Sequence, residues 1–140
     1  MAIRQLSVFV ENKKGSLHEI TDVLAKANID LRSMCIADTS DYGIVRIIAD
    51  DPIRAQEILA KAGHLANVRE VTAFAAPDAP GGLAQVLDLL EENGVNLEYL
   101  YALVTRNVGK AYAVARTDDP AKAEEILKAN AIDLLSENDI

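Results

Sequence analysis

The alternation of apolar and polar positions in the first half of the chain predicts six elements in the order strand, helix, strand, strand, helix, strand. Apolar side chains alternate with other residues where a half-buried strand is expected, and recur at helical spacing where an amphipathic helix is expected. Polar residues and glycine separate the segments. The predicted elements are residues 3–10, 16–27, 31–37, 42–49, 52–62 and 67–71.

The residues that flank the two predicted helices mark where each helix begins and ends. Ser16 and Glu19 stand three positions apart before an apolar series, which is the pattern of a capping box. Asp51 followed by Pro52 predicts an N-cap with proline at the first helical position. Two residues that tolerate a left-handed backbone follow the helices, Asn28 and Gly63. We expect the second helix to bury Ile53, Ile58, Leu59 and Ala62.

The second half of the chain repeats the first. Gly15 returns 66 positions later as Gly81, and Pro52 returns 68 positions later as Pro120. Because the offset grows by two, the predicted loop before Pro120 is two residues longer than the corresponding loop before Pro52. Such a repeat indicates two copies of one small structural unit. In the second copy we expect a strand at residues 71–76 and a helix at residues 82–93. Two strands, 97–105 and 110–116, form a hairpin across a turn at Arg106-Asn107. A helix begins at residue 120, and the last strand is residues 132–135. Its first helix is expected to bury Leu83, Val86, Leu87 and Leu90.

This order of elements predicts an α+β fold in which each copy is a ferredoxin-like sandwich, an antiparallel sheet covered on one face by two helices. We expect one unit at residues 1–70 and another at residues 71–140. The predicted strands meet near residues 70–72 without a Gly/Ser/Pro-rich linker, so we expect a stiff junction and a rigid pair. Units of about 70 residues bury little surface alone, and the chain is therefore expected to form a homodimer.

Composition narrows the classes of function. The formal net charge is −8, and no basic stripe interrupts the acidic surface, which argues against nucleic-acid and anionic-membrane partners. The single cysteine, Cys35, excludes an internal disulfide framework and favours a reducing compartment. No apolar run has the length of a membrane helix, and the first residues do not resemble a signal peptide, so we expect a cytoplasmic protein.

The connection between the first strand and the first helix is the candidate site in each unit. Gly15 and Gly81 allow the backbone to approach a ligand closely, and the helix that follows offers unpaired N–H groups to a carboxylate. Asn12 and Asp78 occupy matching positions, where an oxygen atom can accept a hydrogen bond from an ammonium group. A free α-amino acid carries both groups. A purely structural turn is the alternative explanation.

Three features together resemble the ACT domain, a family of small regulatory modules that bind amino acids. They are the unit topology, the Gly-x-Leu sequence that opens the first helix of each copy, and the segments Asn28-Ile29-Asp30-Leu31 and Gly94-Val95-Asn96-Leu97 before the second strands. The resemblance covers the whole chain as a tandem pair, similar to free-standing two-ACT proteins without an attached enzyme. It implies a ligand at an interface between two units, where one unit supplies the loop and the other supplies the second strand.

Carried over position by position, the resemblance implies two sets of ligand-binding residues. The loop residues are Asn12, Gly15, Ser16 and Leu17 in the first copy, and Asp78, Gly81, Gly82 and Leu83 in the second. The facing strand segments are Met34, Cys35 and Ile36, and Leu100, Tyr101 and Ala102. Many family members have proline before the glycine. The second copy keeps it as Pro80, whereas the first has Lys14, so the two sites are not equivalent.

The function expected from the sequence is therefore regulatory. The chain senses a free amino acid, signals by its conformation or assembly, and acts on an unidentified enzyme. We expect no catalytic residues, no metal and no cofactor, because two histidines and one cysteine at wide spacing do not form a metal site. The main alternative is a ligand-free adaptor that mediates protein–protein contacts, and an enzyme is the third.

Overall fold

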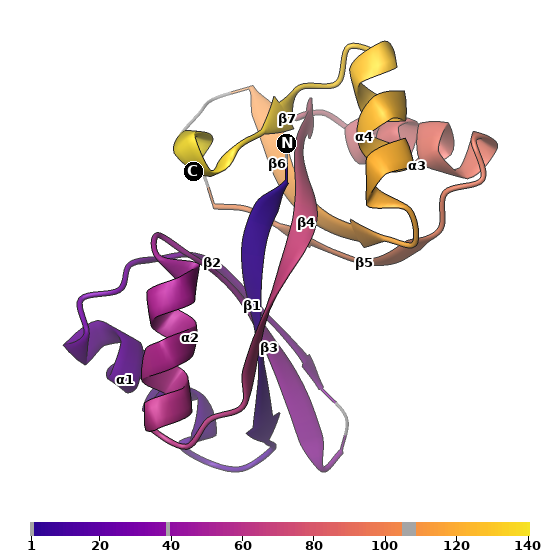
Figure 1. Cartoon of the computed structure of the whole chain (residues 1–140). Coiled ribbons are helices and arrows are strands. Elements are labelled where there is room, and N and C mark those ends of the chain that lie inside the picture. Colours follow the sequence, from indigo (N-terminus) through magenta and orange to yellow (C-terminus); the bar gives the residue numbers. More distant parts are fainter. Residues whose placement is uncertain (1, 39, 105–108) are drawn as a thin grey trace. The chain divides into compact units, whose positions relative to one another are not determined.

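A computed structural model describes residues 2–38, 40–104 and 109–140 of the chain (Figure 1). The chain divides into two compact units. We call Arg4–Arg69 the first unit, and Glu70–Ile140 together with residues 1–3 the second unit. None of the helices in the described ranges is long and apolar enough to cross a membrane.

The first unit has the predicted order of strands and helices, βαββαβ. Within it the strands lie in the order β2-β3-β1-β4, and the β1–β3 and β2–β3 pairs are antiparallel. β2 extends to Asp38, the first residue of the predicted turn, and residue 39 of that turn lies outside the described residues. The elements are β1 (Ile3–Glu11), α1 (Ser16–Lys26), β2 (Leu31–Asp38), β3 (Tyr42–Ala49), α2 (Pro52–Lys61) and the first part of β4 (Ala66–Pro77).

Both helices of the first unit cover the same face of its sheet (Figure 1). The alternation seen in the sequence explains why: Leu6 and Val8 are buried on this face, while Phe9 between Val8 and Val10 is 50% exposed. α1 contributes Ile20 and Leu24 to the core. The remaining buried members of this core are Ile29, Val45, Ile47, Ala49, Ala55, Leu59 and Ala66.

The second unit repeats this arrangement. The later part of β4 occupies the place that β1 has in the first unit, and the strands lie in the order β5-β6-β4-β7. All of the pairs among these four strands are antiparallel. The elements are α3 (Gly82–Glu92), β5 (Leu97–Ala102), β6 (Lys110–Thr117), α4 (Pro120–Ala129), β7 (Leu134–Leu135) and a short 3-10 helix, η1 (Glu137–Asp139).

The core of the second unit lies between its helices and its sheet. Phe74 is its largest fully buried side chain, and alanines fill much of the sheet beneath α3 and α4. The opposite face of the same sheet is buried as well, because Val114 is fully buried and Tyr101, its partner in register, is 8% exposed. Both faces of this sheet therefore carry buried side chains.

Several expectations about individual residues were wrong. Ile53 is 43% exposed and Leu83 is 39% exposed, because each stands in the first turn of its helix, where Pro52 and Gly82 are the buried residues. The strand predicted to extend to residue 105 ends at Ala102, and the last strand has only two residues. The turn predicted at residues 106–107 lies outside the described residues.

The four α-helices end in the same way. The residue after each C-cap has a positive φ, and it donates to the carbonyl three residues earlier, while the next residue donates to the carbonyl five residues earlier. This pair of bonds is the Schellman motif, which satisfies helix-end carbonyls. The four left-handed residues are Asn28, Gly63, Gly94 and Ala131. The expected ends at Asn28 and Gly63 are thus confirmed.

Ala131 is the least favourable of these four residues, because its Cβ opposes the left-handed conformation that it adopts at φ 57°. We expect Ala131→Gly to stabilise the protein by about 0.5–1 kcal/mol after the greater chain entropy of glycine is counted. Chemical denaturation measures the change. Ala129→Gly, two residues earlier inside α4, is the matched control and should destabilise by a similar amount. Equal effects of the two variants would contradict this assignment.

Candidate functional site

The connection between β1 and α1 is a tight turn held by backbone hydrogen bonds. Lys13 N–H donates to Glu11 O at 2.9 Å, and Ser16 N–H donates to Lys13 O at 3.2 Å. Asn12 N–H donates to Asp41 O at 3.0 Å, which ties the turn to the residue before β3. The turn delivers the chain directly into the first turn of α1.

The connection between β4 and α3 has the same backbone bonds, although its sequence differs. Ala79 N–H donates to Pro77 O at 2.9 Å, and Gly82 N–H donates to Ala79 O at 2.9 Å. What the two turns share is the glycine at the helix N-cap. Gly15 has φ 89° and Gly81 has φ 82°, a left-handed conformation that side chains oppose.

Space is open where a side chain would stand on either glycine. A Cβ atom placed on Gly15 or Gly81 would meet no heavy atom within 4 Å. Glycine is therefore needed at these two positions for the left-handed backbone, and not because a side chain would clash with its neighbours in the described chain. The same open space leaves the start of each helix accessible to a ligand.

The helices that follow these glycines begin without a side-chain cap. Asp51 accepts from Arg54 N–H at 3.1 Å at the start of α2, and Asp119 does the same for Lys122 at α4. By contrast, no side chain caps α1 or α3. Within the described ranges, two N–H groups at each of these starts have no acceptor, those of Leu17 and His18 and those of Leu83 and Ala84.

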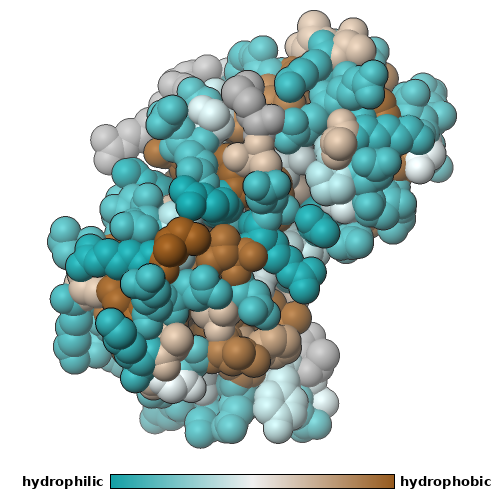
Figure 2. Space-filling view, in the orientation of Figure 1, coloured by the Kyte–Doolittle hydropathy of each residue, from teal (hydrophilic) through white to brown (hydrophobic). Residues whose placement is uncertain are grey.

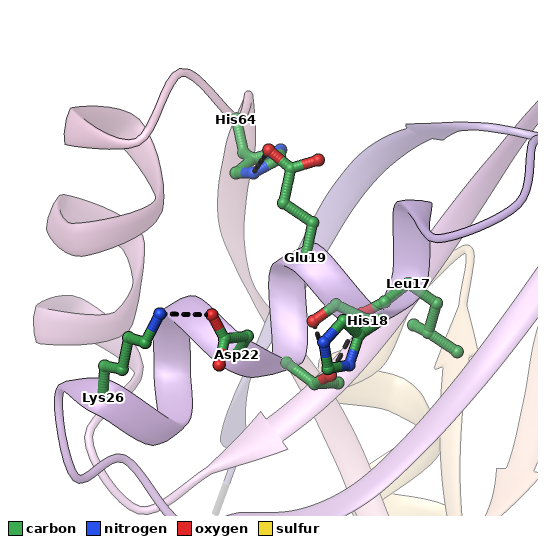
Figure 3. Close-up of polar contacts among 7 residues, drawn as sticks. Leu17, His18, Glu19, Asp22, Lys26 and His64 are labelled. Carbon is green, nitrogen blue, oxygen red and sulfur yellow. Dashed lines mark hydrogen bonds and ion pairs between the residues drawn. The ribbon is translucent and has the colours of Figure 1, made fainter.

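The predicted capping box at Ser16 and Glu19 is therefore wrong, whereas the Asp51-Pro52 prediction is confirmed. Gly15 takes the N-cap position, so Ser16 is already the first helical residue. Glu19 turns elsewhere, and its Oε1 lies 3.6 Å from Nε2 of His64 in the turn after α2 (Figure 3).

One ion pair lies at the turn between β1 and α1. Lys13 Nζ is 3.0 Å from Glu11 Oε2, and both side chains are exposed. The hydrogen bond that Lys13 donates to Glu11, together with the negative charge of Glu11, raises the pKa of Lys13 above its usual value. The lysine charge is thus directed back to the end of β1 and is partly neutralised there.

The two residues predicted to receive an ammonium group occupy corresponding turns but differ in their bonding. Both Asn12 and Asp78 are exposed. Asn12 Nδ2 donates to Ser40 O at 3.4 Å, which orients the side chain toward the β2–β3 connection. Asp78 is held through its backbone, because its N–H donates to Gly109 O at 3.4 Å.

The predicted strand segments alternate between the faces of their sheets. Met34 and Ile36 pair in register with core residues Ile47 and Val45, on the helix-covered face, and they are 41% and 44% exposed at the edge. Cys35 pairs with Arg46 on the other face. The second unit shows the same alternation in Leu100, Tyr101 and Ala102, with the middle residue on the opposite face from the other two.

In the first unit the structure brings part of the predicted set together. A small hollow of about 90 Å³ is lined by Asn12, Ser16 and Leu17 from the turn and by Ile36 from β2. Gly15, Met34 and Cys35 are not among its lining residues. The loop and second strand of a single unit thus already share one surface.

In the second unit the corresponding position is closed by packing. Gly82 stands where the first unit has Ser16, and it is buried. A Cβ atom on Gly82 would lie 2.0 Å from Pro77 O. The loop of the second unit therefore folds closer to its strand and has no room for a side chain there.

Sequence reasoning missed a larger pocket on the first unit. Its volume is about 330 Å³, and its walls are the end of β1, the first turns of α1, the start of β3 and the turn before β4. Phe9, Glu19, Tyr42 and His64 all line it. The one signal in the sequence was Phe9, a large apolar residue on the strand face opposite Leu6, Val8 and Val10.

Comparison with known proteins identifies the family. A model described as an ACT domain pair matches residues 1–140. The crystal structure of protein BT0572 from Bacteroides thetaiotaomicron is 42% identical, with a TM-score of 0.92 over 99% of this chain and 95% of that one. The chain belongs to the ACT domain family, as a pair of ACT domains that covers its whole length. No curated protein matches.

More distant structures share the fold. The ligand-free regulatory subunit of aspartate kinase from Thermus thermophilus is 17% identical, with a TM-score of 0.67 over 91% of this chain and 89% of that one. A structure of aspartokinase α and β subunits is also 17% identical, with a TM-score of 0.63 over 90% of each chain. The expected ferredoxin-like ACT fold is confirmed, and the family match supports a regulatory, ligand-binding role.

The closed loop of the second unit leads to a prediction. Gly82→Ser should destabilise the protein by about 1–3 kcal/mol, because the new side chain overlaps the Pro77 carbonyl and the strand end must move. The reverse change in the first unit, Ser16→Gly, is the matched control, with an expected cost of only about 0.5–1 kcal/mol in helix propensity. Urea denaturation of the two variants compares them. A smaller loss for Gly82→Ser than for Ser16→Gly would contradict the packing argument.

Proposed function

We propose that this ACT pair binds a free α-amino acid at its β1–α1 and β4–α3 turns and signals the bound state through its conformation or assembly. The observation that carries the proposal is the contrast among the four helix starts. The two that follow a left-handed glycine keep two adjacent unpaired N–H groups each, whereas at the other two starts an aspartate accepts one N–H group and proline removes another. Unpaired N–H groups at a helix start favour a carboxylate.

The ammonium group of the ligand is assigned to the rim of each turn. Asn12 in the first unit and Asp78 in the second carry the oxygen atoms that accept its hydrogen bonds. We further propose that the second-strand segments, residues 34–36 and 100–102, complete the sites from a facing ACT unit. The functional units are then residues 1–70 and 71–140, and the side chain of the ligand is selected where loop and strand meet.

Assembly follows from this division. A facing unit for each turn is supplied most simply by a homodimer, which places regulation in the contact between copies. The bound state would be read by an enzyme in the cytoplasm. Light scattering at micromolar protein concentration tests the dimer, and a monomeric mass would remove this part of the proposal.

A thermal-shift screen of the twenty amino acids tests ligand binding. We expect one or a few of them to raise the melting temperature by several degrees, since ligand at 100 times its Kd stabilises one site by about 2.7 kcal/mol. The amide and the N-acetyl derivative of an active amino acid should each lose most of the shift, because each lacks one of the two charges. A flat response to all twenty at millimolar concentration would favour the ligand-free adaptor instead.

Substitution of the turn glycines locates the sites. Gly15→Val and Gly81→Val should each abolish binding at the altered turn, because valine opposes the left-handed backbone and fills the open space above it. Gly94→Val is the matched control, since Gly94 also has a positive φ, 71°, but ends α3 instead of starting a helix. Calorimetric titration of the folded variants compares their affinities. Unchanged affinity in both turn variants, or an equal loss in the control, would refute the assignment.

A further inference from the structure

The 330 Å³ pocket of the first unit has polar groups that the proposed amino-acid sites do not use. His64 lies in the turn before β4, and its side chain is 17% exposed. Its Nε2 atom is buried and makes no hydrogen bond within the described chain. Glu19 Oε1 stands 3.6 Å from this atom, beyond hydrogen-bond distance, while the glutamate side chain is 65% exposed (Figure 3).

The formal charge of the pocket is negative. Glu11 and Glu19 line it together with one lysine, Lys13, and that lysine is already paired with Glu11 at 3.0 Å. The Glu19 carboxylate has no second lysine or arginine beside it among the lining residues, and it faces His64 at 3.6 Å. A ligand that completes this site therefore brings one positive charge and hydrogen-bond donors.

The opposite wall of the pocket is apolar and accessible. Phe9, Tyr42 and Leu65 are 50%, 60% and 64% exposed, and all three line the pocket. Figure 2 shows hydrophobic residues among hydrophilic ones at the surface of the part of the molecule that carries α1 and α2. Aromatic faces beside an anionic group attract organic cations, because the ring quadrupole and the carboxylate favour the same charge.

The second unit serves as an internal comparison. At the positions that correspond to Glu11, Lys13, Glu19 and His64, it has Pro77, Ala79, Gln85 and Ile132. Asp133 replaces Leu65 and pairs with Lys110. The fold is thus maintained without any of these polar groups, so the fold itself does not require them in the first unit.

We propose that this pocket binds a small primary amine carried on an aryl or alkyl body, through Glu19 and His64, which lie outside the hollow at the proposed amino-acid site, although Ser16 lines both. The ammonium group binds the Glu19 carboxylate, and the apolar body lies against Phe9, Tyr42 and Leu65. A ligand carboxylate is disfavoured, because the one lysine present is already engaged by Glu11.

Titration with 2-phenylethylamine, followed by two-dimensional NMR of the full chain, tests the site. We expect saturable shifts at the amides of Glu19, His64 and Leu65 at millimolar amine. The alcohol 2-phenylethanol, which lacks the charge, should bind there at least about tenfold more weakly, as expected for loss of a charge-assisted hydrogen bond. L-phenylalanine keeps the ammonium group but adds a carboxylate, which Glu11 and Glu19 repel, so it should also bind more weakly than the amine. Equal affinity for either compound, or no shift with the amine, would overturn the proposal.

Variants separate this pocket from the proposed amino-acid sites. Glu19→Gln should weaken amine binding at least about tenfold. Asp22→Asn is the matched control, because Asp22 lies on the same helix but pairs with Lys26 at 2.7 Å, outside the pocket lining (Figure 3). Neither change should alter the amino-acid response, whereas Gly15→Val should leave amine binding in place. A Glu19→Gln protein that binds the amine like the control would refute the role of Glu19.

Discussion

Left-handed backbone is the constraint on which both units depend. Side chains oppose this conformation, yet each unit uses it once where its first helix begins and again where each helix ends. At the beginnings it turns the chain from strand into helix without consuming the helix N–H groups. At the ends it returns the chain to the sheet and satisfies the last carbonyls. The residues involved are Gly15, Gly81, Asn28, Gly63, Gly94 and Ala131.

Much of this fold could be predicted from the sequence, because its strongest signals are local. Apolar periodicity located the helices, Asp51-Pro52 marked a real N-cap, and the continuous run near residue 70 became the single strand β4. The sequence repeat supported each predicted element of the first unit, because the second unit predicts the same element at the corresponding position. The family resemblance, which the comparison confirms, rested on the same repeated features.

What failed depended on contacts between segments distant in sequence. Ser16 and Glu19 fit a capping box by spacing, but the left-handed Gly15 starts the helix one residue earlier, and Glu19 lies beside His64, 45 residues away. Ile53 is apolar but stands on the exposed side of its first helical turn. Similarly, the pocket beside β1 forms where four separate segments meet, so no single stretch of sequence predicts it.

The Pro77 carbonyl occupies the space that a side chain on Gly82 would need, and this has a consequence for how the two copies evolve. Two copies of one gene segment start with interchangeable residues, and substitutions can at first pass freely in either direction. Because a Cβ atom on Gly82 would lie 2.0 Å from the Pro77 carbonyl oxygen, a side chain like that of Ser16 fits this turn only after the strand end has changed. Introducing serine here then needs two changes in a fixed order. Such epistasis keeps duplicated sites from converging again and leaves each free to acquire its own ligand.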